Sequence, residues 1–194
     1  MDYKFFLQGI ANIIFNPVKA WETIDSENKP NKVLRDSLFI PLLILVSIST
    51  FVGSLIFANT ELSAVYSIFV GVKSFVLLYL TTYSAAFILK EITHPLDLGR
   101  DFNISFRLIV YSIIPFILCE VLSGLFESLL FVDVIGLYGL YIFWTGAEKL
   151  LNPAQHKKMP MLIATTISII SIYAALSFVL NMMTNKIYYA YFIK

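Results

Sequence analysis

Cysteine, histidine and charged residues are scarce in this chain of 194 residues. Its one cysteine, Cys119, has no partner for an internal disulfide or a thiolate metal site. Its two histidines, His94 and His156, stand far apart without metal-binding or catalytic spacing. Because 14 Lys+Arg against 13 Asp+Glu leave a net charge of only +1, nucleic-acid binding is not expected. We therefore predict no enzyme activity, no cofactor, no metal and no nucleic-acid partner.

Apolar residues are as abundant in this chain as charged residues are scarce. Hydrophobic residues form 58% of the chain, charged residues only 14%, and the mean hydropathy is +0.79. A protein this small has too much surface to hide so many apolar side chains in one water-soluble core. A disordered chain would be polar and rich in charge. The composition therefore predicts an integral membrane protein that crosses the bilayer several times.

Five segments contain enough apolar residues to cross the hydrocarbon layer, for which a helix needs about 20. They are residues 38–58, 65–89, 105–126, 129–150 and 161–183. None alternates apolar and polar residues with the period of two that marks a transmembrane β-strand. Very short links join the first segment to the second and the third to the fourth, so these pairs are expected to form helical hairpins. We predict a single all-α membrane domain over residues 1–194, a bundle of five transmembrane helices.

The N-terminal segment, residues 1–36, has a different pattern. Apolar residues recur there at steps of three and four with polar residues between them, and Asn16-Pro17 interrupts the pattern. This pattern predicts one or two amphipathic helices that lie in the membrane interface. A signal peptide is not expected, because the segment has no basic start and no small-residue cleavage site after an apolar run. The apolar positions are Phe5, Phe6, Ile10, Ile13, Ile14, Val18 and Trp21.

The basic residues predict the orientation. Eleven of them fall before the first span, between the second and third, or between the fourth and fifth, and only two fall on the opposite side. Since positive residues stay in the cytoplasm, we expect a cytoplasmic N-terminus and an external C-terminus. The eleven are Lys4, Lys19, Lys29, Lys32, Arg35, Lys90, Arg100, Arg107, Lys149, Lys157 and Lys158, and the two are Lys186 and Lys194.

Three ionisable residues fall inside the predicted spans at similar depth. From the helical rise, Lys73 lies about 12 Å, Glu120 about 9 Å and Asp133 about 6 Å from the outer face. An ionisable group in hydrocarbon needs a partner, a cavity or a route to the interface. One interpretation is a buried Lys73–Glu120 pair with Asp133 nearby, lining a polar pocket or solute path. The other is structural: Lys73 and Asp133 reach outward to the headgroups, and Glu120 is protonated or structurally paired.

Proline and glycine mark two further features. Pro115 removes the helical donor to the carbonyl of Tyr111, so a kink is expected, with Ser112 or a neighbouring helix satisfying that carbonyl. The kink is either a hinge of the kind that transporters use or an ordinary proline of a membrane helix. In the fourth span, Gly136 and Gly139 predict close helix packing, as does Gly146. The hydroxyls of Tyr138 and Tyr141 are then available for hydrogen bonds across helices.

The order of these motifs resembles the bacterial branch of the Ypt-interacting-protein (Yip) domain family. The resemblance rests on Asn16-Pro17 with Trp21 soon after, on Tyr111-Ser112-Ile-Ile-Pro115, and on the glycine- and tyrosine-rich stretch from Gly136 to Gly146. A lysine-bearing loop, His156-Lys157-Lys158, then precedes the last span. For eukaryotic members, the resemblance implies binding of Rab-type GTPases in vesicle traffic. For bacterial relatives, it implies an integral inner-membrane protein without catalytic residues.

Two functions remain open from the sequence. The first is a non-enzymatic scaffold that organises the membrane or recruits a protein through its cytoplasmic basic face and amphipathic segment. The alternative is a small-solute or ion permease that uses Lys73, Glu120 and Asp133. The expected partners are the lipid bilayer, a protein on the cytoplasmic face and, for a homo-oligomer, a second copy of the chain. The expected location is the bacterial cytoplasmic membrane.

Overall fold

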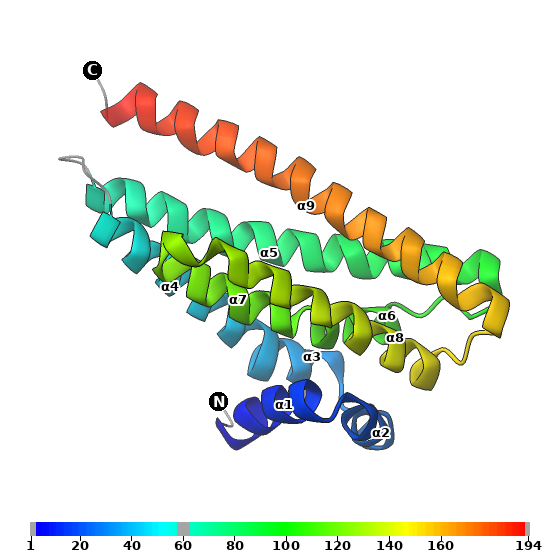
Figure 1. Ribbon diagram of the computed structural model, residues 1–194. Helices are drawn as coiled ribbons and strands as arrows, with labels where there is room; N and C mark the ends of the chain where they lie inside the picture. The colour runs from blue at the N-terminus through cyan, green and yellow to red at the C-terminus, as the bar shows by residue number, and fades with distance from the viewer. Residues whose placement is uncertain (1–2, 58–62, 193–194) are drawn as a thin grey trace.

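The computed structural model describes residues 3–57 and 63–192, and every regular element in them is a helix (Figure 1). The predicted all-α class is therefore confirmed. The N-terminal elements are α1 (Tyr3–Phe15), α2 (Pro17–Glu27), α3 (Asn31–Leu34) and the π-helix η1 (Arg35–Phe39), which continues into α4 (Ile40–Phe57). The central elements are α5 (Ser63–Thr93), the 3-10 turn η2 (His94–Leu96), α6 (Phe102–Ser112) and α7 (Ile114–Leu125). The last are the 3-10 helix η3 (Glu127–Leu137), α8 (Tyr138–Leu150) and α9 (Gln155–Phe192).

Three helices of the described residues are long and apolar enough to cross a membrane: Asn31–Phe57, Ala64–Leu96 and Gln155–Ala190. They coincide with the first, second and fifth predicted spans, except that residue 58 lies outside the described residues. A fourth candidate is the bent pair Phe102–Ser112 and Ile114–Leu125, whose halves meet at 43°. By length and composition, the described part of the chain thus holds three or four candidate spans instead of the predicted five.

The predicted fourth span, residues 129–150, is not one continuous α-helix. Its first part belongs to η3, and only the part from Tyr138 onward is α-helical. At Leu129 the backbone leaves helical geometry altogether (φ −97°, ψ 17°). Hydropathy reports how apolar a segment is but not how tightly its backbone winds, so it predicts the segment and misses its conformation.

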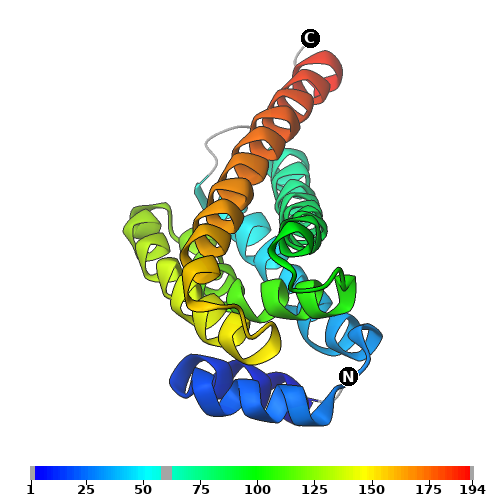
Figure 2. The same ribbon diagram turned by 90° about the vertical axis from the view of Figure 1, so that its right-hand side faces the viewer.

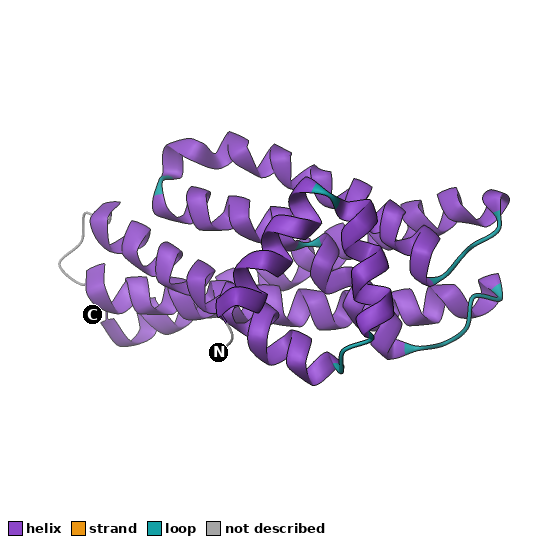
Figure 3. Cartoon of the chain, turned by 90° about the horizontal axis from the view of Figure 1, so that it is seen from below, coloured by secondary structure: helices purple, strands orange, loops and turns teal. Residues whose placement is uncertain are grey.

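The long helices run side by side, and short links join them at two ends of the bundle (Figures 1 and 3). One end holds the last turn of α4, the first of α5, the turn from α7 to η3 and the end of α9. The other end, which we call the loop end, holds the links from α5 to α6 and from α8 to α9. Helices α1 and α2 lie on the flank opposite α9 (Figure 2).

Aromatic side chains dominate the buried centre. Trp21, Phe39 and Phe106 are among the largest fully buried residues, and they come from α2, η1 and α6. The rings of Phe39 and Phe106 meet edge to face, with 6.0 Å between their centres. Edge-to-face packing stabilises aromatic pairs beyond the burial of their area. The centre of the bundle is therefore protein-lined, while large apolar side chains such as Phe178 and Ile170 stay exposed on α9.

Candidate functional site

Lys73 and Glu120 do not form the direct pair that the sequence predicts as one possibility. In the described residues, Lys73 Nζ donates a hydrogen bond to Asn181 Oδ1 over 2.8 Å. The carboxylate of Glu120 accepts one from the Tyr173 hydroxyl over 3.1 Å. The opposite charges of Lys73 and Glu120 still attract each other at longer range. Both partners come from α9, so the two ionisable groups connect the same helix to α5 and α7.

Asp133 has a separate partner. Its Oδ1 atom accepts a hydrogen bond from the Ser123 hydroxyl over 3.1 Å, which joins the middle of η3 to the end of α7. Ser123, Tyr173 and Asn181 are not among the site residues predicted from the sequence, because opposite charges, and not neutral groups, are the expected partners of buried ions. The sequence feature that points to these three residues is that each is polar and stands in an otherwise apolar stretch.

The bend at Pro115 separates α6 from α7. The Ser112 hydroxyl donates to the Leu108 carbonyl over 2.7 Å, so it does not satisfy the carbonyl of Tyr111 as expected. The N–H of Ile113 instead faces both the Ile109 and the Tyr111 carbonyls. The backbone N–H of Ile113, which lies between the two helices, thus takes the place of the N–H that Pro115 lacks.

Three glycines allow close approach in η3 and α8. A Cβ atom on Gly136 would lie 3.0 Å from Phe116 Cα, and one on Gly139 would overlap the Ser112 carbonyl oxygen. A Cβ atom on Gly146 would overlap the indole of Trp21. Since only glycine leaves room for these contacts, the three positions set the spacing between the fourth segment and its neighbours.

The N-terminal segment docks on this glycine-rich face. It forms two helices separated at Asn16, whose side chain accepts a hydrogen bond from the Lys19 N–H. Trp21 of α2 is fully buried, and its indole N–H donates to the Ile142 carbonyl over 3.0 Å. The Tyr138 hydroxyl donates to the Ile14 carbonyl of α1 over 3.0 Å, a hydrogen bond across helices of the kind expected for this tyrosine.

The other side of α1 and α2 carries exposed apolar side chains. Phe15 is 86% exposed, Leu7 64% and Val18 51%. These three residues, which we call the α1–α2 apolar face, lie on helices whose buried side is already occupied by the bundle. An apolar face without a partner within the chain marks a contact with lipid or with another protein.

Links between charged and polar groups surround the loop end. Lys157 at the start of α9 donates to the Leu96 carbonyl over 2.7 Å and to Asp97 Oδ2 over 2.9 Å. The hydrogen bond from Lys157 lowers the pKa of the exposed Asp97 carboxyl below its usual value. Arg107 donates to Asn28 Oδ1 over 3.0 Å and to the Lys29 carbonyl over 2.9 Å, which connects α6 to the loop after α2.

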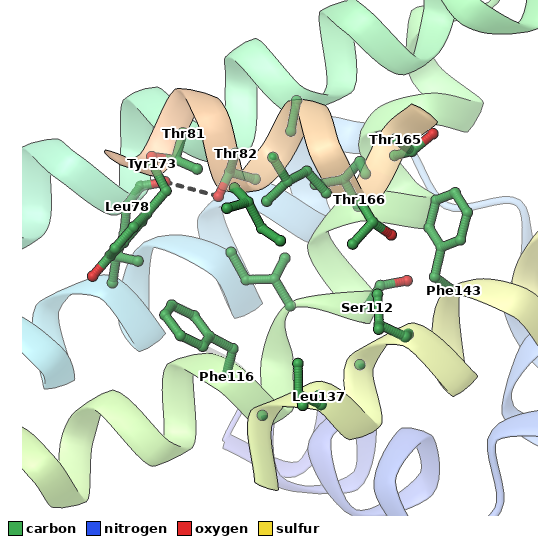
Figure 4. Close-up of a pocket in the computed structure, with 18 of the residues that line it drawn as sticks. Leu78, Thr81, Thr82, Ser112, Phe116, Leu137, Phe143, Thr165, Thr166 and Tyr173 are labelled. Atoms are coloured by element: carbon green, nitrogen blue, oxygen red, sulfur yellow. Dashed lines mark hydrogen bonds between the residues drawn. The ribbon is translucent and has the colours of Figure 1, made fainter. Parts of the chain in front are cut away.

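A cavity of about 280 Å³ lies beneath α9 (Figure 4). Its walls come from α5, α6, α7, η3, α8 and α9, and most of its lining side chains are apolar. Asp133 is the one carboxylate among the described lining residues, and Tyr173, which donates a hydrogen bond to Glu120, lies beside Leu78 and Thr81 in Figure 4. No group of His, Cys, Asp and Glu in the described residues has the arrangement of a metal site.

The apolar helices define a multi-pass, all-helical membrane protein. Comparison with known families then gives a particular assignment: the model of the Yip1 domain matches residues 11–180. The match covers most of the chain, which therefore belongs to the Yip1 domain family, in agreement with the resemblance noted in the sequence. Neither the search of curated proteins nor the search of solved structures found a match.

Proposed function

We propose that this chain is a non-enzymatic scaffold of the cytoplasmic membrane that recruits a protein partner through the α1–α2 apolar face. The proposal treats residues 1–194 as one domain with five spans, a cytoplasmic N-terminus and an external C-terminus, in a bacterial inner membrane. The observation that carries it is the combination of a firmly docked segment, held by the buried Trp21, with Phe15 left 86% exposed. A segment that packs on the bundle with one side and exposes apolar side chains on the other is suited to binding another protein.

The lengths of the segments support five crossings. At about 2.0 Å per residue for a 3-10 helix and about 1.5 Å for an α-helix, the part of η3 after Leu129 and α8 have a combined length of about 35 Å. The hydrocarbon layer is about 30 Å thick. The fourth segment is therefore long enough to cross even though it does not contain one long α-helix. An odd number of crossings agrees with the placement of the C-terminal end and the loop end at opposite ends of the bundle.

The positive residues support the orientation. Lys157, Arg100 and Arg107 belong to the loop end or its flanks, where the positive-inside rule assigns the cytoplasm. With that orientation, α1 and α2 approach the bundle from the cytoplasmic half, and the exposed Lys19 faces an aqueous or headgroup environment. We propose an interfacial position for this segment because its exposed side contains both apolar and charged residues.

We assign Lys73, Glu120 and Asp133 a structural role in the scaffold. Each has a hydrogen-bond partner on a neighbouring helix, and two of those partners lie on α9. A permease path would need a continuous polar lining, whereas the lining of the cavity in the described residues is mostly apolar. The geometry therefore favours the scaffold over the permease.

Photocrosslinking in intact cells tests the recruitment. A benzophenone amino acid at Phe15 is expected to yield adducts with one protein partner, while the same probe at Phe178, 72% exposed on α9, reacts with lipid. Val18→Ser is expected to lower the Phe15 adduct severalfold, because it removes an apolar contact next to the probe. Glu22→Gln, one turn further along α2, is the matched control and leaves the yield unchanged. Adducts with lipid alone at Phe15, or equal yields for both variants, contradict the recruitment.

A further inference from the structure

The cavity beneath α9 opens towards the lipid. Three of its lining residues are also strongly exposed: Leu137 (62%), Leu140 (36%) and Ile170 (61%). They come from η3, α8 and α9, so they mark a mouth on the side of the bundle between these elements. All three are apolar, and α9 is long and apolar enough to cross the membrane. A molecule that enters through this mouth must therefore come from the hydrocarbon layer.

Two buried hydroxyl groups line the same cavity without a hydrogen-bond partner. Thr81 of α5 is 3% exposed and Thr165 of α9 is 2% exposed, and neither Oγ1 atom has a partner in the described residues. The neighbouring hydroxyls behave differently: Thr82 donates to the Leu78 carbonyl over 2.8 Å, and Ser112 donates to the carbonyl of Leu108. A hydroxyl on a helix can thus donate a hydrogen bond to a carbonyl of its own helix, whereas the hydroxyls of Thr81 and Thr165 do not. Leaving such groups buried without a partner is unfavourable.

The shape and charge of the cavity restrict what can fill it. Thr81 and Tyr173 lie at one side and Thr165 and Phe143 at the other, with apolar side chains between them (Figure 4). An apolar cavity of about 150 Å³ holds one benzene molecule of six heavy atoms, so about 280 Å³ corresponds to about eleven heavy atoms. The carboxylate of Asp133 in the lining, with Glu120 behind Tyr173, disfavours an anion.

From these observations we propose that the cavity binds a neutral, single-chain lipophile with a hydroxyl or carbonyl group. The chain enters from the bilayer between α9 and the η3–α8 segment. Its apolar carbons fill the space beneath α9, and its oxygen forms hydrogen bonds with the hydroxyls of Thr81 or Thr165. The site is separate from the α1–α2 apolar face, because its described lining comes from α5, α6, α7, η3, α8 and α9, whereas α1 and α2 lie on the flank opposite α9 (Figure 2).

Photoaffinity labelling of the full chain in phosphatidylcholine vesicles tests the site. The probes are octanol and octanoic acid, each with a diazirine in the chain so that the alcohol has about eleven heavy atoms, at a pH at which the acid is ionised. The alcohol is expected to label peptides of α5 and α9 that line the cavity, and the acid at least tenfold less. Thr81→Val or Thr165→Val keeps the shape and removes the hydroxyl, so at least one of them is expected to lower labelling by the alcohol about fivefold. Thr82→Val is the matched control and leaves labelling unchanged, because its hydroxyl is already satisfied.

Filling the cavity provides a second, independent readout. Ala85→Phe and Ile169→Phe add a ring from α5 and from α9, and each is expected to abolish labelling by the alcohol. Two variants from different helices are used so that misfolding of one does not decide the result. Equal labelling by alcohol and acid, or equal labelling of the wild type, Thr81→Val and Thr165→Val, overturns the proposal, since water would then satisfy the hydroxyls. Labelling that persists in both filled variants overturns the cavity as the site.

Discussion

Helix α9 and the pair α4–α7 are held in the bundle by different means. Between α4 and α7 the backbones nearly touch: a Cβ atom on Gly53 would overlap the carbonyl oxygen of Gly124. Helix α9 is apolar too, yet only 6% of its most hydrophobic stretch is buried, against 33% for the stretch that contains α4. Its links to the rest of the chain include polar ones, through Tyr173, Asn181 and Lys157.

The difference has a physical cause. In a bilayer, lipid tails are as apolar as leucine, so helices associate through close packing and through hydrogen bonds. Small residues make close packing possible at Gly53 and Gly124. Helix α9 packs along α5 but has little contact with α8, so a cavity lined by residues such as Ile169 remains beneath it. The packed pair gives the bundle its shape, and the tethered helix leaves room for a ligand.

The largest effect is expected when the packed pair is disrupted. Gly53→Ala places a Cβ atom against the backbone of α7, which no side-chain rotation can relieve, and should cost about 3 kcal/mol of unfolding free energy. Gly9→Ala is the matched control, because its Cβ would meet only Leu38 Cδ1 at an ordinary 3.8 Å. Denaturant unfolding in detergent measures both variants. Equal stability of the two would mean that α4 and α7 do not approach as closely as described.

A medium effect is expected at the tethers of α9. Tyr173→Phe and Glu120→Met each break the same hydrogen bond and should each cost about 1 kcal/mol, with a coupling of about 0.6 kcal/mol in the double variant. Lys73→Met combined with Glu120→Met should be additive within about 0.5 kcal/mol, because Lys73 bonds Asn181 instead. The same unfolding measurement completes both cycles. A strong coupling between Lys73 and Glu120 would indicate that they form a direct pair and would contradict the described geometry.

The smallest effect is expected at the loop end, where α9 begins. The folded pKa of Asp97 lies below its ordinary value because Lys157 donates a hydrogen bond to it. Its contribution to stability is therefore present above the ordinary carboxyl pKa of about 3.9 and is lost as the pH falls through the lowered value. Lys157→Met should have a lower free energy of unfolding than the wild type at pH 7, and this difference in free energy should become smaller below about pH 4. Lys149→Met, at an exposed lysine of α8, serves as the control, and a difference independent of pH would contradict the ion pair.

The sequence predicts features that depend on neighbouring residues in the chain better than features that depend on residues far apart in it. The break at Asn16-Pro17 and the bend at Pro115 depend on local backbone chemistry, so the sequence points to both positions. The partners of Lys73 and Glu120 depend on which helices become neighbours, and those partners lie 108 and 53 residues further along the chain. In η3, Gly136 lies close to Phe116 of α7, and the backbone leaves helical geometry at Leu129. Such contacts leave no periodic signal in the sequence.

The amino-acid sequence alone determined the medium of this protein, its helical class and its family, because hydrophobic content and motif order are properties of the chain itself. The tertiary structure decided which helices approach closely, which neutral side chains form hydrogen bonds with the intramembrane ionisable groups, and where two threonine hydroxyls are buried without a partner among the described residues. These features arise from distances between residues far apart in the chain, which the fold brings together, most closely where glycines allow the backbones to approach.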